Sequence, residues 1–138
     1  MNRYAVLLAT VAVAVAVAFA AAANAAAPSE TLSVSSARST VTAFFHALEQ
    51  RRFQKACWLL GNELLAESGG ANCPRFLRFG MPDPLVWHIL GSRPKARSVG
   101  IVVRLGQNEL DHVRMRTWLA VVRIEYRSLR IVETRLLA

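Results

Sequence analysis

Cys57 and Cys73 are the two cysteines of this 138-residue chain, and their pairing is the most specific chemistry that the sequence suggests. A disulfide between them would close a loop of about 15 residues, worth roughly 3 kcal/mol in the chain-entropy model. The alternatives are two buried free thiols or a catalytic cysteine. Cys57 lies in an apolar helical stripe, and such surroundings disfavour the thiolate that catalysis needs. The choice between disulfide and free thiols depends on the compartment.

The other residue types that carry chemistry form no recognisable set. His46, His88 and His112 are scattered and lack the spacing of metal ligands. The chain also has no glycine-rich phosphate loop. We therefore expect no metal and no cofactor.

The first 25 residues have the features of an export signal. Arg3 supplies a positive charge, Ala5–Ala23 is almost entirely apolar, and Ala23-Asn24-Ala25 offers the small residues that a signal peptidase reads. We predict a signal peptide over residues 1–25 and a secreted or extracytoplasmic protein. The alternative is a protein anchored in the membrane by an uncleaved N-terminal helix, since this run could just span a bilayer. Alanine contributes little to membrane insertion, which favours cleavage.

Export would also determine the state of the cysteines. Because two cysteines in a small exported domain usually pair, we predict a structural disulfide between Cys57 and Cys73. Cleavage would leave 113 residues, which is enough for one domain with a modest core. We expect a flexible lead-in over residues 26–34 and a single domain over residues 35–138.

The chain is strongly basic, with 17 Lys and Arg against 9 Asp and Glu and a sequence pI near 11.0. Loss of Arg3 with the leader would leave a net charge of +7. This charge permits weak association with an anionic polymer or a membrane surface. The basic residues are spread along the chain, so no specific nucleic-acid motif is predicted.

Three helices are expected in the first half of the domain. The first begins near Ser35 or Ser36, either of which can cap it, and the second spans Phe53–Ser68 and ends at Gly69-Gly70. A short third helix runs from the Cys73 region to about Phe79. Trp58 lies off the apolar stripe of the second helix, so it either packs under the Cys73 segment or belongs to a partner surface.

The second half of the domain changes to the period of two that is typical of strands. Leu85–Leu90 is a helical turn or a short strand, and Gly91–Pro94 is expected to be a loop. Alternation begins at Ala96 and predicts an antiparallel sheet to Leu137, with a turn at Gly106–Asn108. At the start of the next strand the inward-facing residues are Val113 and Met115, at odd positions. At its end they are Val122 and Ile124, at even positions. This change predicts a bulge near Thr117–Leu119. A final strand is expected at Leu129–Leu137.

Two stretches, Val41–Leu48 (VTAFFHAL) and Phe53–Leu60 (FQKACWLL), resemble the small exported domains of the nuclear transport factor 2-like superfamily, which includes ketosteroid isomerase. In those domains a helix of the first pattern leads into an Ala-Cys-x-Leu-Leu helix, and a second cysteine follows. The resemblance extends from Ala37 to Leu137. It implies an α+β fold in which N-terminal helices pack on a curved antiparallel sheet, the cystatin-like or nuclear transport factor 2-like cone.

The same resemblance implies where an active site would lie if there were one. Enzymes of the superfamily use a general base and an oxyanion donor inside the cone. The candidates in this chain are Asp111, His88 and Tyr126. Asp111 and His112 are adjacent on a strand and point to opposite faces, so no convergent acid–base pair can be assembled from the spacing.

Three hypotheses for the function follow. We favour an exported non-catalytic domain that binds a small apolar ligand in the cone or a protein partner. The second is an isomerase-like or hydratase-like enzyme that uses the cone interior. The third is a basic domain that associates with an anionic cell-wall polymer or a membrane surface.

Overall fold

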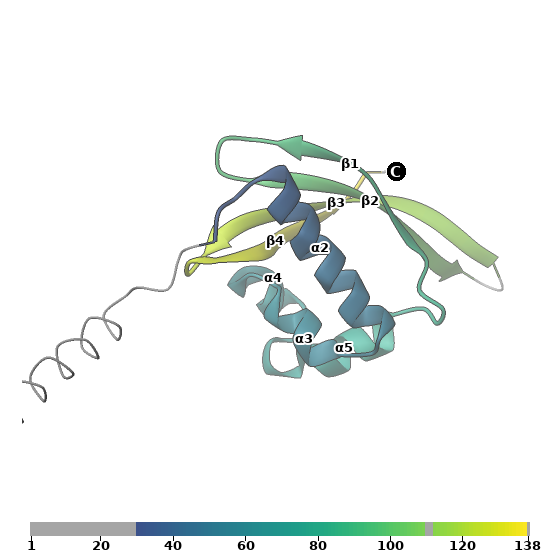
Figure 1. Ribbon diagram of the computed structural model, residues 1–138. Helices are drawn as coiled ribbons and strands as arrows, with labels where there is room; N and C mark the ends of the chain where they lie inside the picture. Colours follow the sequence, from purple (N-terminus) through teal and green to yellow (C-terminus); the bar gives the residue numbers. More distant parts are fainter. Residues whose placement is uncertain (1–29, 110–111, 138) are drawn as a thin grey trace, which may run out of the picture.

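The computed structural model describes residues 30–109 and 112–137. The predicted signal peptide, residues 26–29 of the lead-in and the candidate Asp111 lie outside these ranges. The helices pack on one face of a four-stranded antiparallel sheet of order β1-β2-β3-β4 (Figure 1), so the predicted α+β fold is confirmed. In the described ranges, no helix has the length and apolar character that a membrane crossing requires.

Helices come first in the chain and strands follow. The helical elements are α2 (Val34–Glu49), α3 (Phe53–Trp58), α4 (Asn62–Glu67), the 3-10 turn η1 (Gly70–Asn72) and α5 (Cys73–Gly80). The strands are β1 (Trp87–Pro94), β2 (Val99–Glu109), β3 (His112–Glu125) and β4 (Ser128–Leu136).

The first helix is capped by Ser33, so the prediction of a cap at Ser35 or Ser36 was wrong. The Ser33 hydroxyl accepts from the Ser36 backbone N–H at 3.0 Å, and the Ser36 hydroxyl accepts from the Ser33 N–H at 2.8 Å. These reciprocal bonds form a capping box, which satisfies two backbone donors at the helix start. Before the cap, the Glu30 carboxylate accepts from the backbone N–H of Leu129, so the end of the lead-in contacts the β3–β4 hairpin.

The predicted helix Phe53–Ser68 is broken in two, and the sheet causes the break. Between α3 and α4 the chain pairs with β4: the N–H of Ile131 donates to the carbonyl of Leu59 at 2.8 Å, and the N–H of Gly61 donates to the carbonyl of Ile131 at 2.8 Å. A Cβ on Gly61 would lie 2.9 Å from Val132 Cγ1, so glycine permits this close approach. The spacing of apolar residues within 53–68 could not reveal this break, because the break depends on pairing with β4.

The sheet begins earlier than predicted, because β1 includes residues 91–94, which were expected to be a loop. Strand β1 is attached to α2 through Trp87. The Trp87 indole stacks on Phe45 with ring centroids 5.0 Å apart, and its Nε1–H donates to Glu49 Oε1 at 2.7 Å. Glu49 also lies 2.9 Å from Nδ1 of His46. Residues 87–90 belong to β1, which pairs with β2, so this part of Leu85–Leu90 follows the strand alternative, while residues 85 and 86 precede the strand.

Two further predictions about β2 and β3 were wrong. Residues 106–108 pair with residues 113–115 rather than forming a turn, and the register from Glu109↔His112 to Val99↔Val122 is continuous, without a bulge at Thr117–Leu119. Regular pleating therefore puts Val113 and Val122 on opposite faces. The bulge prediction assumed one covered face along the whole strand, but the β2–β3 hairpin runs past the helices (Figure 1). The register shift occurs between β3 and β4, at Val121/Val122.

Side chains fill the space between α2 and the sheet. The largest that are fully buried come from α2, the sheet and the disulfide: Ile101, Ile131, Val41, Val103, Val122, Cys57 and Cys73. The alternation predicted from Ala96 puts Val99, Ile101 and Val103 on one face of β2, where all three are buried and Leu105 packs against the core.

Candidate functional site

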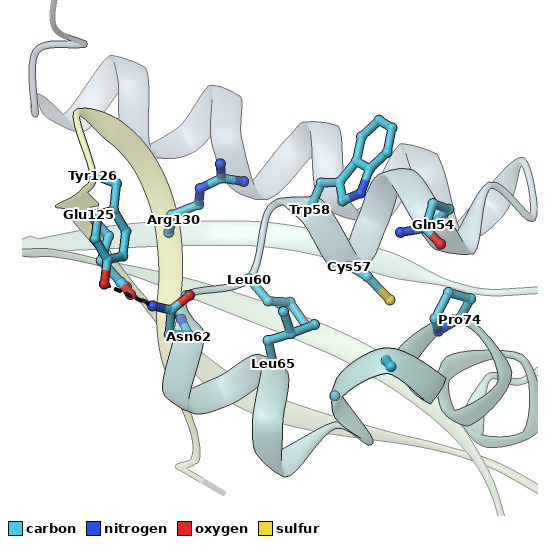
Figure 2. A pocket seen from close by; sticks show the side chains of 13 residues that line it. Gln54, Cys57, Trp58, Leu60, Asn62, Leu65, Pro74, Glu125, Tyr126 and Arg130 are labelled. Atoms are coloured by element: carbon cyan, nitrogen blue, oxygen red, sulfur yellow. Dashed lines mark hydrogen bonds between the residues drawn. The ribbon is translucent and has the colours of Figure 1, made fainter.

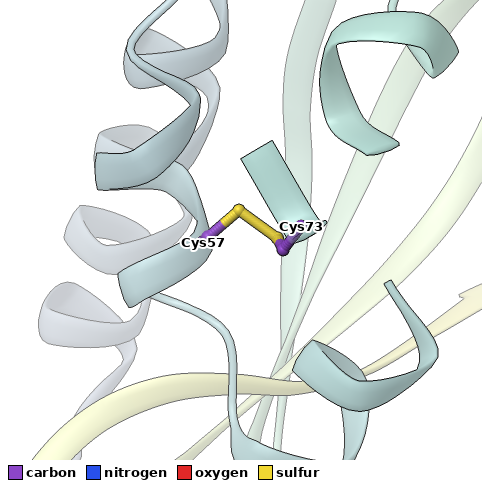
Figure 3. Close-up of a disulfide and its surroundings, with 2 residues drawn as sticks. All are labelled: Cys57 and Cys73. Atoms are coloured by element: carbon purple, nitrogen blue, oxygen red, sulfur yellow. A yellow bond between two sulfur atoms is a disulfide. The ribbon is translucent and has the colours of Figure 1, made fainter. Parts of the chain in front are cut away.

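Cys57 and Cys73 form a disulfide that joins α3 to the start of α5 (Figure 3). Both residues are buried, with exposed fractions of 2% and 0%. On each helix the residues beside the cysteine that face the core are also buried: Phe53 and Ala56 on α3, and Leu77 on α5. The bond thus fixes which faces of the two helices remain exposed. It also suggests an oxidising, extracytoplasmic location.

The exposed face of α5 carries arginine and phenylalanine. At 100° per residue, Arg75, Arg78 and Phe79 project away from the buried Cys73 and Leu77. The proline at the second helical position supports the start of this short helix, because its missing N–H is not needed there.

Helix α3 and the turn before it provide the facing wall. Arg51 and Arg52 precede α3, and Lys55 and Trp58 lie on its exposed side. Arg51 has a φ of 56°, the left-handed conformation that turns the chain sharply between α2 and α3. Between the two walls lies an open hollow of about 740 Å³, which we call the basic groove. It is lined by Arg51, Arg52, Phe53, Gln54, Lys55, Trp58, Pro74, Arg75, Arg78 and Phe79.

The groove contains five cationic side chains and no carboxylate. Across the described residues, the one ion pair to any of these cations joins Arg51 to Asp83 at 3.8 Å, with both side chains more than half exposed. An exposed pair of this kind contributes little to stability. Arg52, Lys55, Arg75 and Arg78 have no such partner within the described part of the chain. The groove therefore has an uncompensated positive charge.

Aromatic rings are placed between the charges. Arg51 and Arg78 lie 5.4 and 5.7 Å from the centroid of Phe53, and Arg75 lies 5.8 Å from that of Phe79. These are cation–π distances, which help to hold the guanidinium groups on the two helices. Phe53 is buried beneath its two arginines, whereas Phe79 and Trp58 are 77% and 65% exposed. Trp58 is therefore a surface residue, and the alternative in which the Cys73 segment covers it was wrong.

A second, smaller cleft of about 380 Å³ adjoins the basic groove and contains Tyr126 (Figure 2). Here the Asn62 backbone N–H donates to Glu125 Oε1 at 3.0 Å, and its side-chain amide donates to the Tyr126 hydroxyl at 3.2 Å. A carboxylate at the first residue of α4 complements the free backbone donors of that helix end. These polar groups thus hold α4 on the β3–β4 hairpin. Gln54, Trp58 and Pro74 line both hollows.

Of the three candidate catalytic residues, the structure describes His88 and Tyr126, and it does not bring these two together. His88 is exposed on β1 opposite Arg104, on the face away from the helices, because its neighbour Trp87 packs against α2. Tyr126 lies in the β3–β4 turn with a φ of 50° and is 82% exposed. Asp111 is outside the described residues. Within the described ranges, no three His, Cys, Asp or Glu side chains are grouped as metal ligands would be.

No family model matches the sequence, and no curated protein matches it. Among solved structures, the chain is similar to an NTF2-like (nuclear transport factor 2-like) protein of unknown function from Cytophaga hutchinsonii. The match covers 78% of this chain and 92% of that one, with 12% sequence identity and a TM-score of 0.48. The likeness concerns the fold alone.

Proposed function

We propose that the protein is an exported, non-catalytic domain that binds an anionic partner through the basic groove. The observation that carries this proposal is the groove lining of five cations without a carboxylate. Positive charge gathered in one hollow attracts polyanions far more than the same charge dispersed over a surface. Of the three hypotheses from the sequence, this arrangement favours association with an anionic polymer or membrane surface.

Two features of the fold make the other hypotheses less favourable. An apolar ligand in the cone would need space between α2 and the sheet, where Val41, Ile101 and Val103 are almost completely buried. An isomerase-like enzyme would need a base and a donor that converge on one point. The positions of His88 and Tyr126, on the outer face of β1 and in the β3–β4 turn, do not favour such convergence.

Neutralising two groove arginines should weaken binding to inorganic polyphosphate about 30-fold. The variant Arg75→Gln/Arg78→Gln removes two charges, each worth about 1 kcal/mol near an anionic surface. Titration at low salt measures the affinity. For the unmodified protein it should fall as salt is added, since the screening length shortens to about 10 Å at 0.1 M.

The matched control is Arg93→Gln/Arg97→Gln, which makes the same change in net charge at exposed positions near the β1–β2 turn. Its affinity for polyphosphate should stay within about threefold of the unmodified protein, because surface charges outside the groove act only through the screened field. Equal losses in the two variants would mean that net charge, rather than the groove, determines binding.

Export itself predicts that the protein recovered outside the cytoplasm begins at Ala26. The basis is the small-residue site Ala23-Asn24-Ala25 after an apolar run. N-terminal sequencing measures this directly. A membrane-bound protein that retains Arg3 would instead support the alternative of an uncleaved N-terminal anchor.

A further inference from the structure

We infer that the anionic partner of the basic groove is the surface of a lipid bilayer, with Trp58 and Phe79 entering the interfacial layer. This inference rests on the proposed function and identifies the class of partner. It depends on the exposed rings and on where the groove cations lie relative to them.

Three of the four exposed aromatic side chains among the described residues line the groove or the adjoining cleft. Trp58 on α3 and Phe79 on α5 line the groove, and Phe76, which is 55% exposed, lies on the same helix. Tyr126 lines the adjoining cleft. Exposed rings of this size cost free energy in water, and Trp in particular is enriched at membrane interfaces.

The cations are placed beside the rings rather than apart from them. Arg75 lies over the Phe79 ring, and Lys55 lies three residues before Trp58 on the exposed side of α3. Arg and Lys can lay their apolar stems along a membrane surface while their charged groups remain at the level of the lipid phosphates. A surface that offers rings and such cations together is suited to anionic headgroups above an apolar layer.

Single-stranded nucleic acid is the other polymer that binds basic surfaces with aromatic residues. A base stacks on the face of a ring, and here Arg75 covers a face of Phe79 while Phe53 is buried under Arg51 and Arg78. Of the three groove rings, Trp58 alone has no cation over a face within the described part of the chain, so the groove offers one open stacking platform rather than a row of them for successive bases. The disulfide also favours an oxidising compartment outside the cytosol and nucleus, where nucleic acid is chiefly held.

The test uses the exported protein, purified from the extracytoplasmic fraction, with vesicles of phosphatidylcholine alone or mixed with phosphatidylglycerol. We expect binding to the anionic vesicles, little binding to the neutral ones, and a blue shift of tryptophan emission on binding. Because Trp87 and Trp118 remain, Trp58→Phe should keep the binding and lose most of the shift.

The decisive variant is Trp58→Ala/Phe79→Ala. Its affinity for the anionic vesicles should fall at least about tenfold, because partial burial of two rings exceeds the free energy of one decade of affinity. Its affinity for soluble polyphosphate should stay within about threefold of the unmodified protein. The matched control is Leu90→Ala/Val113→Ala, which removes apolar side chains that are 57% and 60% exposed on the sheet and should leave vesicle binding unchanged. Thermal melts establish that each variant is folded.

The outcomes separate the two proposals. The lipid assignment is overturned if Trp58→Ala/Phe79→Ala binds anionic vesicles as tightly as the unmodified protein. It is also overturned if oligothymidylate binds the protein more tightly than the vesicles do at equal salt. In both cases the proposal of an anionic partner remains. If Arg75→Gln/Arg78→Gln binds both vesicles and polyphosphate as tightly as the unmodified protein, the proposed function is overturned as well.

Discussion

Replacing Cys57 and Cys73 with alanine should lower the melting temperature by about 10 °C or more. The bond links residues 16 apart in sequence, and a loop of this length restricts the unfolded chain by roughly 3 kcal/mol in the entropy model. A typical domain of this size is stable by only 5–15 kcal/mol, so this contribution is a large share. The melting temperature is measured by circular dichroism on the double variant and the unmodified protein.

The unmodified protein in a reducing agent provides the internal control, because it loses the crosslink without losing side-chain volume. Its melting temperature should fall toward that of the double alanine variant, which should not respond to the reductant. Thiol titration of the exported protein should find no free thiol. Two titratable thiols, or a disulfide-linked dimer, would contradict the structural role assigned to the bond.

The parts of the fold that follow from local pattern could be predicted from the sequence. The stripe of Val41, Phe45 and Leu48 predicts the buried face of α2, and the alternation from Val99 to Val103 predicts the inward face of β2. In both patterns, residues only a few positions apart in sequence pack against the same core. The cysteine pair depends on compartment as well, which the leader indicates independently of the fold.

The errors arise where a distant segment decides the local structure. The break between α3 and α4 depends on backbone pairing with Ile131, about 70 residues away, and the strand at residues 91–94 depends on pairing with β2. The turn expected at residues 106–108 was wrong because those backbone groups pair across the hairpin. Glycine and asparagine indicate that a turn is allowed, but pairing across the sheet determines where it forms.

The basic groove could not be read from the sequence, because its two walls are separate segments. Arg51, Arg52 and Lys55 lie about 20 residues before Arg75 and Arg78, so the charges look evenly spread along the chain. The local signal was the spacing of Arg75, Arg78 and Phe79 opposite Cys73 and Leu77, which gives α5 one charged aromatic face. Combining that face with the disulfide, which puts α5 beside α3, would have predicted the groove.

The core around Ile131 connects the helices to the sheet, and truncating it should have a large effect on stability. The Ile131 side chain is 1% exposed and packs in the main core, while its backbone makes both hydrogen bonds to the Leu59–Gly61 segment. The variant Ile131→Ala keeps those backbone bonds but leaves a cavity under the helices. It should lower the free energy of unfolding by about 3 kcal/mol, within the 2–5 kcal/mol seen for such truncations.

Ile124 provides a matched control on the neighbouring strand of the same hairpin. It is 44% exposed, so Ile124→Ala removes the same atoms from a site that water already reaches and should cost less than about 1 kcal/mol. Urea unfolding gives both values, and an unchanged slope with denaturant would show that only stability has altered. Similar losses in the two variants would contradict the inference that the buried side chain of Ile131 stabilises the core between the helices and the sheet.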